Sequence, residues 1–231
     1  VVCEAIRRVK PDFYVDLGDT GEWGSVSHFQ WKKKKRPPLE YQLPRVYQDI
    51  KDVNKGMDQI DKALDAVKCN ERYFLEGNHE QWLNNFAEEN PYLQGLTVRD
   101  ALLLDQRGYE YYPNGKYLKI GHLHYYHGNH YSGVAHARNH LTRLGCNVMY
   151  GHHHDLQMAS VTHVDGPKSA WSIGCLKNMS DEANGWLGNR KTNWQHAFAV
   201  VDYYTDDRFT VHVVNILDGV TSLWGKTIDG N

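Results

Sequence analysis

Four short blocks, each combining a glycine with polar residues, follow one another along this chain. They are Gly18-Asp19, Gly77-Asn78-His79-Glu80, His127-Gly128 and Gly151-His152-His153-His154. Each block comes after an apolar run typical of a buried strand, and its glycine lets the backbone turn sharply where the strand ends. Carboxylate, amide and imidazole groups gathered from several strand ends are what a two-metal hydrolytic centre needs. We therefore expect an α/β protein with a metal site at a sheet edge.

The apolar pattern between the blocks alternates between the periods of strand and helix. Helices are predicted where apolar residues recur every three or four positions, over 2–9, 43–67, 98–104 and 134–144. Strands are predicted for short apolar runs bounded by turn residues, over 13–17, 72–76, 109–112, 117–126, 147–150, near 161, 170–173, 197–203 and 209–216. We infer two sheets packed face to face with helices outside, in one domain spanning residues 1–231.

Two segments break the periodic pattern and are predicted to be loops. The first, from Trp23 to Pro44, contains the basic run Lys32–Arg36. This run could follow a nucleic-acid backbone, with Trp23, Trp31 and Tyr41 stacking on bases, but a solvated loop is the favoured interpretation. The second, Ala183–Asn193, is rich in Gly and Asn, and we expect it to shape the substrate pocket together with the basic loop.

Charge and composition restrict the class of protein. The formal net charge of −2 gives no general attraction to nucleic acid or to anionic membranes. No run approaches 18 apolar residues, and the first residues lack the features of a signal peptide. The four cysteines form no CxxC pair, which favours a reducing compartment. We expect a soluble cytoplasmic protein without a membrane partner, whose oligomeric state the sequence leaves open.

The donor types in the blocks restrict the metal. Asp19 offers a carboxylate that can bridge two ions, and Asn78 offers a neutral amide oxygen. Imidazoles come from His127, His152 and His154, and this mixture suits Mn, Fe or Zn better than Mg or Ca. If residues 152–154 are extended, His152 and His154 lie on one side and His153 faces away. A similar Gly121-His122-Leu123-His124 run lies inside a predicted strand, so its histidines are interpreted as one face of that strand.

In order and residue type, the blocks resemble those of the calcineurin-like metallophosphoesterase superfamily, which includes purple acid phosphatases, Ser/Thr protein phosphatases, cyclic-nucleotide phosphodiesterases and Mre11-type nucleases. The resemblance covers about residues 1–155, and 156–231 would complete the second sheet. It implies a four-layer αββα sandwich, made of two mixed β-sheets flanked by helices. It also implies a dinuclear centre with two divalent metal ions, for which we favour Mn2+ over Fe or Zn.

The resemblance also implies a role for each block residue. Asp19 would bridge the two metals, Asn78, His127 and His152 would complete the shell of one, and His154 would bind the other. His79 would bind no metal but would protonate the leaving alkoxide, with Glu80 as the partner that fixes its tautomer.

Two departures from the family pattern stand out. The family's first block, Asp-x-His, supplies two ligands to the metal that His154 serves, and none precedes Asp19 here. We expect this block to lie upstream of Val1, in a chain truncated at its N-terminus, rather than to be lost in a natural single-metal enzyme. The block usually written Gly-Asp-x-x-Asp also ends in Glu22 here.

The expected function is metal-dependent hydrolysis of phosphate esters, in which water activated at the dinuclear centre attacks phosphorus in line. The sequence leaves open whether the substrate is a monoester or a diester. Two alternatives remain: an Mre11-like nuclease acting on DNA or RNA, and a degenerate non-catalytic binding module. The pairing of His79 with Glu80 argues against the second, because a scaffold needs no leaving-group acid.

Overall fold

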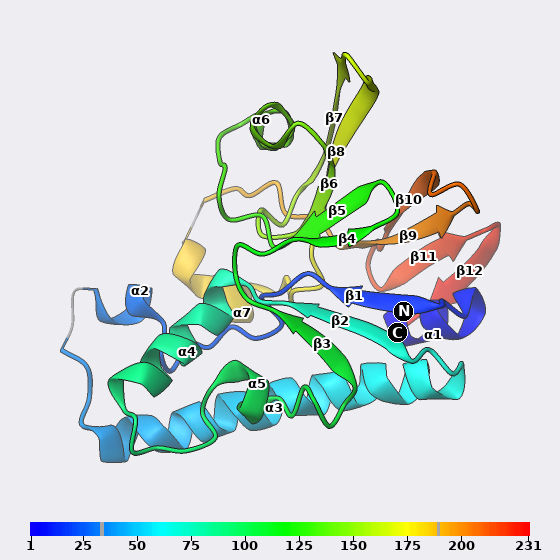
Figure 1. The fold of residues 1–231 in the computed structure, drawn as a ribbon. Coiled ribbons are helices and arrows are strands. Elements are labelled where there is room, and N and C mark those ends of the chain that lie inside the picture. The colour runs from blue at the N-terminus through cyan, green and yellow to red at the C-terminus, as the bar shows by residue number, and fades with distance from the viewer. Residues whose placement is uncertain (33–34, 189) are drawn as a thin grey trace. The chain divides into compact units, whose positions relative to one another are not determined.

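The chain forms two compact units in a computed structural model that describes residues 1–32, 35–188 and 190–231. The first unit comprises residues 2–116, and the second comprises residues 117–231 together with Val1. Helices and several sheets occur together (Figure 1), so the expectation of a mixed α/β protein is confirmed. The packing of the two sheets on each other and the single-domain assignment stay predictions.

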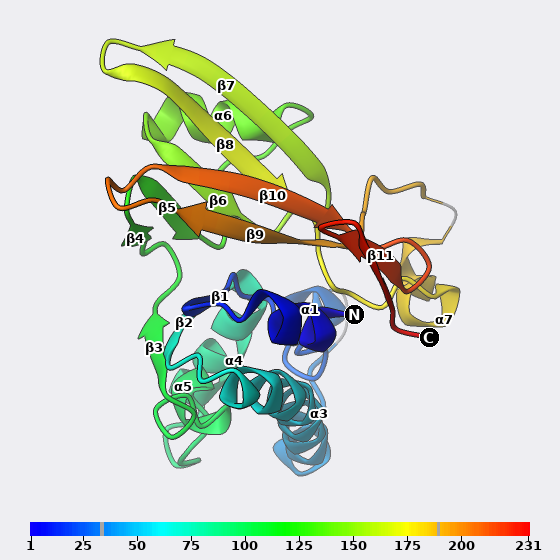
Figure 2. The same ribbon diagram turned by 90° about the vertical axis from the view of Figure 1, so that its right-hand side faces the viewer.

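The first unit is built on a parallel sheet of three strands in the order β1 (Phe13–Asp16), β2 (Glu71–Leu75) and β3 (Tyr109–Tyr112). The long helix α3 (Leu39–Ala66) connects the first two strands, and α4 (Asn78–Glu89) with α5 (Val98–Ala101) connects the next two. Because right-handed crossovers between successive parallel strands put their helices on one face, these helices share a face of the sheet (Figures 1 and 2). The shorter α1 (Val2–Val9) packs against α3, and α2 (His28–Trp31) precedes it.

Apolar side chains from each of these layers fill one core. The amphipathic stripe predicted for residues 43–67 supplies Val46 and Met57 of α3, which are buried against Phe74 of β2 and Leu83 of α4. Burial of such side chains provides the main driving force for folding of this unit. The core therefore fixes the two strands whose carboxyl ends carry the first two sequence blocks.

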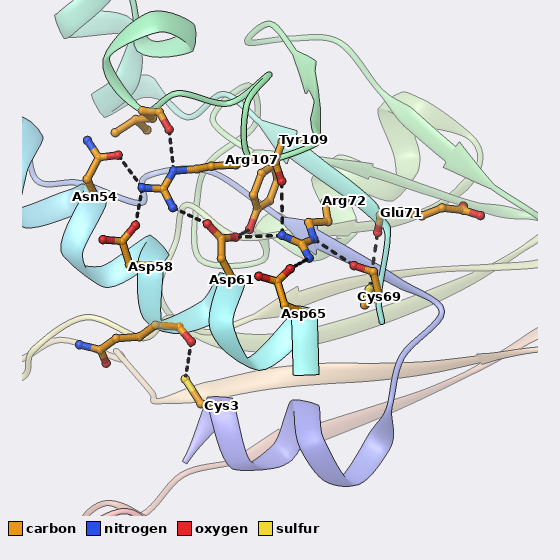
Figure 3. Close-up of polar contacts among 12 residues, drawn as sticks. Cys3, Asn54, Asp58, Asp61, Asp65, Cys69, Glu71, Arg72, Arg107 and Tyr109 are labelled. Atoms are coloured by element: carbon orange, nitrogen blue, oxygen red, sulfur yellow. Dashed lines mark hydrogen bonds and ion pairs between the residues drawn. The ribbon is translucent and has the colours of Figure 1, made fainter. Parts of the chain in front are cut away.

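A network of ion pairs, shown in Figure 3, ties α3 to the starts of β2 and β3. Its central carboxylate, Asp61, is 9% exposed and accepts a hydrogen bond of 2.9 Å from the Tyr109 hydroxyl. Asp61 also pairs with Arg72 at 3.4 Å and with Arg107. Burial raises the pKa of Tyr109, so its hydroxyl remains a donor. The network joins three segments that are distant in sequence through one buried anion.

The second unit contains a mixed sheet in the order β4-β5-β6-β8-β7. Its strands are β4 (Leu118–Ile120), β5 (Leu123–Tyr126), β6 (Asn147–Tyr150), β7 (Leu156–His163) and β8 (Gly166–Ile173). The helix α6 (His136–Leu144) connects the parallel strands β5 and β6 and packs against β6, β7 and β8. Their common core includes Tyr126, Leu141, Val148 and Tyr150.

The remaining residues of this unit form smaller elements. Strands β9 (Ala197–Tyr203) and β10 (Phe209–Asn215) make an antiparallel pair, as predicted for this segment. A second pair, β11 (Val220–Leu223) and β12 (Lys226–Asp229), was not predicted. Between β8 and β9 lie α7 (Asp181–Asn184) and a 3-10 turn at Gly185–Leu187, which occupy part of the segment expected to be a loop.

Three predicted elements differ in detail. The expected loop at 23–44 contains α2, and α3 begins within it at Leu39, with Pro44 inside the helix. Proline 38, with φ −52° and ψ 147°, provides the extended residue from which this helix starts. The expected strand at 117–126 is a hairpin, because Gly121 turns the chain with φ +52° between β4 and β5. His122 therefore lies in a turn and not on a strand face.

Some expectations fall on residues that are not described. They concern Lys33 and Lys34 of the basic run and Asn189 of the later insert, which lie outside the described residues. Among the helices of the described ranges, none has both the length and the apolar character that a membrane crossing requires.

Removal of the Asp61 carboxylate should destabilise the first unit strongly. In Asp61→Ala, two buried guanidinium groups and a buried hydroxyl lose their common acceptor, so we expect the free energy of unfolding to fall by about 3–5 kcal/mol. Urea denaturation measures this loss. The matched control is Asp105→Ala, because the Asp105–Arg99 pair is exposed, with side chains 58% and 57% accessible. That control should cost at most about 1 kcal/mol, and equal losses in the two variants would contradict a central role for Asp61.

Candidate metal centre

Parallel pairing in the first unit brings its two blocks to one edge of the sheet. Strands β1 and β2 are in register from Phe13 opposite Glu71 to Asp16 opposite Phe74, so both end at the same edge. The Gly18-Asp19 and Gly77-Asn78 turns follow directly. The position predicted for these blocks, at the carboxyl ends of neighbouring strands, is confirmed.

The two glycines let these turns touch backbone to backbone. A Cβ atom on Gly18, whose φ is +85°, would lie 2.4 Å from the Gly77 nitrogen. A Cβ atom on Gly77 would lie 2.2 Å from Oδ1 of Asp19. Side chains larger than hydrogen are thus excluded at both positions, and Asp19 is held directly against the start of α4.

The carboxylate of Glu80 joins the same two turns from within the protein. The residue is 0% exposed. Its Oε2 accepts hydrogen bonds from the backbone nitrogens of Asp19, at 2.7 Å, and Gly77, at 3.0 Å. Its Oε1 accepts from Gly21 N at 3.2 Å and from the indole nitrogen of Trp23 at 2.9 Å. Since a carboxylate has about four acceptor positions, these donors satisfy a buried charge.

Through these contacts, Glu80 holds the turn at Asp19 in place. Its expected role as the residue that fixes the tautomer of His79 stays a prediction. They also correct the stacking role considered for Trp23. That side chain is 1% exposed and donates to Glu80, so its faces are not open to a base. Tyr41 is 66% exposed on α3, while Trp31 is half-buried and donates to the carbonyl of Ser25.

Asp19 and His79 lie together in the first unit. Oδ1 of Asp19 accepts from the backbone nitrogen of His79 at 2.9 Å, and Oδ2 lies 3.9 Å from Nε2 of His79. Their side chains are 10% and 21% exposed. Asn78, the first residue of α4 and the residue before His79, is half-buried. The arrangement places a shielded carboxylate, an amide and an imidazole at one helix start.

The second unit repeats the arrangement with histidines. Strands β5 and β6 end in register, Tyr126 opposite Tyr150, and the Gly151 nitrogen donates to the carbonyl of His127 at 3.0 Å. Nε2 of His127 lies 3.2 Å from Nδ1 of His152, and His127 is 2% exposed. Two nitrogens bound to one ion at about 2.0–2.1 Å lie about 2.9 Å apart at 90° and about 3.4 Å apart at the tetrahedral angle. The observed separation fits a shared metal ion.

Three of the expected ligands have left-handed backbone conformations. The φ angles are +55° at Asp19, +58° at His152 and +64° at His154. Such conformations in residues other than glycine cost about 1–3 kcal/mol each and concentrate at functional sites. They also correct one expectation: residues 152–154 turn instead of running extended, so alternation of faces does not apply. The His154 ring meets the edge of Trp194, with centroids 5.0 Å apart.

Behind this turn lies a buried network of histidines and tyrosines that sequence reasoning did not identify. His153 donates from Nε2 to the carbonyl of Tyr131 at 3.0 Å, and its ring stacks on His136 at 3.8 Å. His136 pairs through Nε2 with Asp155 at 2.9 Å and through Nδ1 with the hydroxyl of Tyr150 at 2.8 Å. The turn that carries His152 and His154 is therefore fixed by the hydrogen bond and the ring stacking of His153, and by the pairing of Asp155 with His136.

His140 completes the network. Its Nε2 donates to the Tyr131 carbonyl at 2.8 Å, and its Nδ1 accepts from the Tyr126 hydroxyl. Burial lowers the pKa of His140 to about 3 and also lowers that of His153. Burial raises the pKa of both Tyr126 and Tyr150, so these hydroxyls remain donors. Neutral His140 and His153 thus match their contacts.

Buried histidine and aspartate groups that could hold a metal ion are present in the described residues, and one consists of His136, His140 and His153. Both ring nitrogens of His136 and of His140 already have partners, so a metal there would have to displace hydrogen bonds. We interpret this group as support for the neighbouring turn. The spacing of His136 and His140 by one helical turn was the sequence signal for a shared helix face.

The structure thus brings together Asp19, Asn78, His79 and Glu80 in the first unit and His127 with His152 in the second. Glu22, the last residue of the block that starts at Gly18, is exposed. No protein-family model matches the chain, and a search of the curated proteins finds no match. A function for the chain is therefore inferred from these residues and from the resemblance of their blocks.

The contact between Gly77 and Asp19 can be tested by adding one methyl group. In Gly77→Ala the Cβ atom would overlap Asp19, so we expect about 1–3 kcal/mol of destabilisation from overpacking. The control is Gly56→Ala, because a Cβ atom there meets nothing within 4 Å on the long helix α3. That change should stabilise by about 0.5–1 kcal/mol. Denaturation midpoints check both, and a neutral Gly77→Ala would show that the two turns can separate.

Burial of neutral His140 should weaken the fold in acid. Its pKa is about 3 when folded and about 6.5 when unfolded, so the unfolded chain binds more protons between these values and stability falls as pH falls. Replacement with His140→Gln should reduce the loss between pH 7 and pH 4.5 by about 2 kcal/mol. Denaturation in EDTA at both pH values measures it, with His122→Gln in the exposed turn as control. Equal acid losses in wild type and His140→Gln would contradict the prediction.

Proposed function

We propose that this chain is a metal-dependent phosphoesterase that hydrolyses phosphomonoesters or phosphodiesters. The proposed metal ligands are Asp19, Asn78, His127, His152 and His154, with His79 as proton donor to the leaving group. The observation that carries the proposal is the pair of imidazole nitrogens of His127 and His152, 3.2 Å apart at neighbouring strand ends.

The donor set fits Mn, Fe or Zn. Imidazole nitrogen together with carboxylate and amide oxygen is the combination these metals accept. The left-handed conformations at Asp19, His152 and His154 support the fit, because such strain is retained where the surrounding structure fixes a functional group. A hydrogen bond between His127 and His152 would give the same distance, so the metal must be tested directly.

Bound divalent metals would supply a Lewis acid and a means of activating water. The chain's own residues would position the metal ligands and the proton donor. The backbone N–H of His79 donates to Oδ1 of Asp19 at 2.9 Å, and this hydrogen bond orients the carboxylate. His79 itself stacks on Trp82, with ring centroids 4.1 Å apart, and this contact orients its ring for proton transfer.

The proposal includes the four-layer αββα sandwich that the resemblance implies. It is supported by the arrangement within each unit, where helices α3–α5 cover one face of the first sheet and α6 packs against the second sheet.

Metal content and turnover distinguish ligands from the proton donor. Protein loaded with Mn2+ and gel-filtered should retain metal and hydrolyse para-nitrophenyl phosphate or its bis ester. Asp19→Asn and His127→Gln should each lose both metal and activity. His79→Ala should keep its metal while kcat falls about 10²–10⁴-fold, since a general acid contributes about that factor.

The control is His122→Gln, which removes a histidine from an exposed turn and should change neither quantity. Retention of metal by both Asp19→Asn and His127→Gln would contradict the proposed centre. Loss of metal from His79→Ala would make His79 a ligand. Metal binding without hydrolysis of either ester would favour the non-catalytic binding module.

A further inference from the structure

A chain of aromatic rings extends outward from His79 in the first unit. Beyond Trp82, which stacks on His79, lie His28 and Phe29 of α2, with ring centroids 5.5 Å and 5.7 Å from that of Trp82. The rings of His28 and Phe29 are 3.9 Å apart. We define these side chains, His28, Phe29 and Trp82, as the aromatic platform.

The exposed residues of this chain of rings lie at its outer end. The His79 side chain is 21% exposed and Trp82 is half-buried, whereas Phe29 is 63% exposed. A phenylalanine that served only to cover Trp82 would be expected to bury its own ring as well. Instead the platform offers an open aromatic surface that is continuous with the proposed proton donor.

The platform is held in place by the segment before α2. Both the nitrogen and the hydroxyl of Ser25 donate to Asp49 of α3, at 3.0 Å and 2.6 Å. The Ser25 carbonyl accepts from Gln42 of α3 at 2.9 Å and from Trp31 of α2 at 3.4 Å. A short helix fixed in this way can present rings with little loss of entropy on binding.

We infer that the aromatic platform is a subsite for a planar aromatic leaving group of the phosphate ester. The inference rests on the phosphoesterase function proposed above. If His79 protonates the leaving oxygen, the group attached to that oxygen lies on the same side of the phosphate as His79. A planar ring there can stack on the faces of Phe29 and Trp82, whereas an alkyl group cannot make this contact.

Two kinds of substrate could supply the planar ring, a simple aryl ester and a nucleotide. The assay therefore compares 1-naphthyl phosphate, a nucleoside 5′-phosphate and ethyl phosphate in Mn2+-loaded protein. Base–aromatic stacking contributes about 5- to 150-fold to affinity, as measured by alanine substitution. Phe29→Leu keeps an apolar side chain and removes the ring, and Phe29→Tyr keeps the ring.

We expect Phe29→Leu to lower the ratio of kcat/KM for an aromatic ester to that for ethyl phosphate by about tenfold. Phe29→Tyr should restore the wild-type ratio. A larger effect on the naphthyl ester identifies a simple aryl group, and a larger effect on the nucleotide identifies a nucleobase. The control, Tyr92→Leu, removes a ring that is 67% exposed in the segment after α4 and should leave the ratio unchanged. An unchanged ratio in Phe29→Leu overturns the inference.

A binding measurement separates this inference from the proposed function. The indole NMR signal of Trp82, identified by its absence in Trp82→Phe, is followed during titration with the methylphosphonate monoester of 1-naphthol. We expect the signal to shift in wild type and Phe29→Tyr, and the Kd to rise about tenfold in Phe29→Leu. If the signal shifts but the protein hydrolyses none of the esters, the proposed phosphoesterase function is refuted and the aromatic subsite is retained. Hydrolysis without any shift or Phe29 dependence refutes the subsite alone.

Discussion

The positions of Asp19 and of the start of α4 in the first unit depend on the hydrogen bonds that the buried carboxylate of Glu80 accepts. A charge that is 0% exposed is tolerated only when its acceptor positions are filled, and here the donors are backbone N–H groups of the two turns and one indole. The turns are therefore held at a fixed spacing by the requirement to satisfy one anion. This hydrogen bonding also fixes the position of Asp19, because the backbone nitrogen of Asp19 is one of the donors. The close approach of the two turns also requires glycine at positions 18 and 77, because a Cβ atom at either position would overlap the other turn.

In the second unit, histidines and one carboxylate hold the corresponding turn in place. The turn at His152–His154 is fixed by His153, whose ring stacks on His136 and whose nitrogen donates to a main-chain carbonyl. Asp155 then anchors His136 from the end of the turn. A fully satisfied polar network in a protein interior specifies one arrangement, since each alternative leaves a buried group unpaired. Left-handed backbone at two candidate ligands can be maintained because this network sets the path of the chain.

The sequence predicted the positions of the blocks because those positions follow from local physics. An apolar run followed by a glycine and a polar residue ends a buried strand wherever it occurs, so the turns after β1, β2, β5 and β6 were predicted correctly. Contacts that depend on distant residues were not predictable. The hairpin at Gly121 looked like one strand because both of its arms are apolar, and the partners of Trp23 and His136 lie at Glu80 and Asp155. The expected pairing of Glu80 with His79 came from the family resemblance. The main-chain donors that Glu80 accepts from at Asp19 and Gly21 are distant in the sequence, so no local pattern indicated them.

Stabilising and functional groups occupy opposite ends of the same strands in the first unit. Arg72 and Tyr109 join the Asp61 network at the starts of β2 and β3, whereas Gly77 and the proposed site follow the end of β2. A strand rises about 3.3 Å per residue, so the five residues of β2 separate the network from the edge by about 15 Å. The ion pairs can therefore secure the sheet without constraining the edge, where strain is concentrated at Asp19. This division explains how one small parallel sheet can combine a rigid base with an edge built from glycine turns.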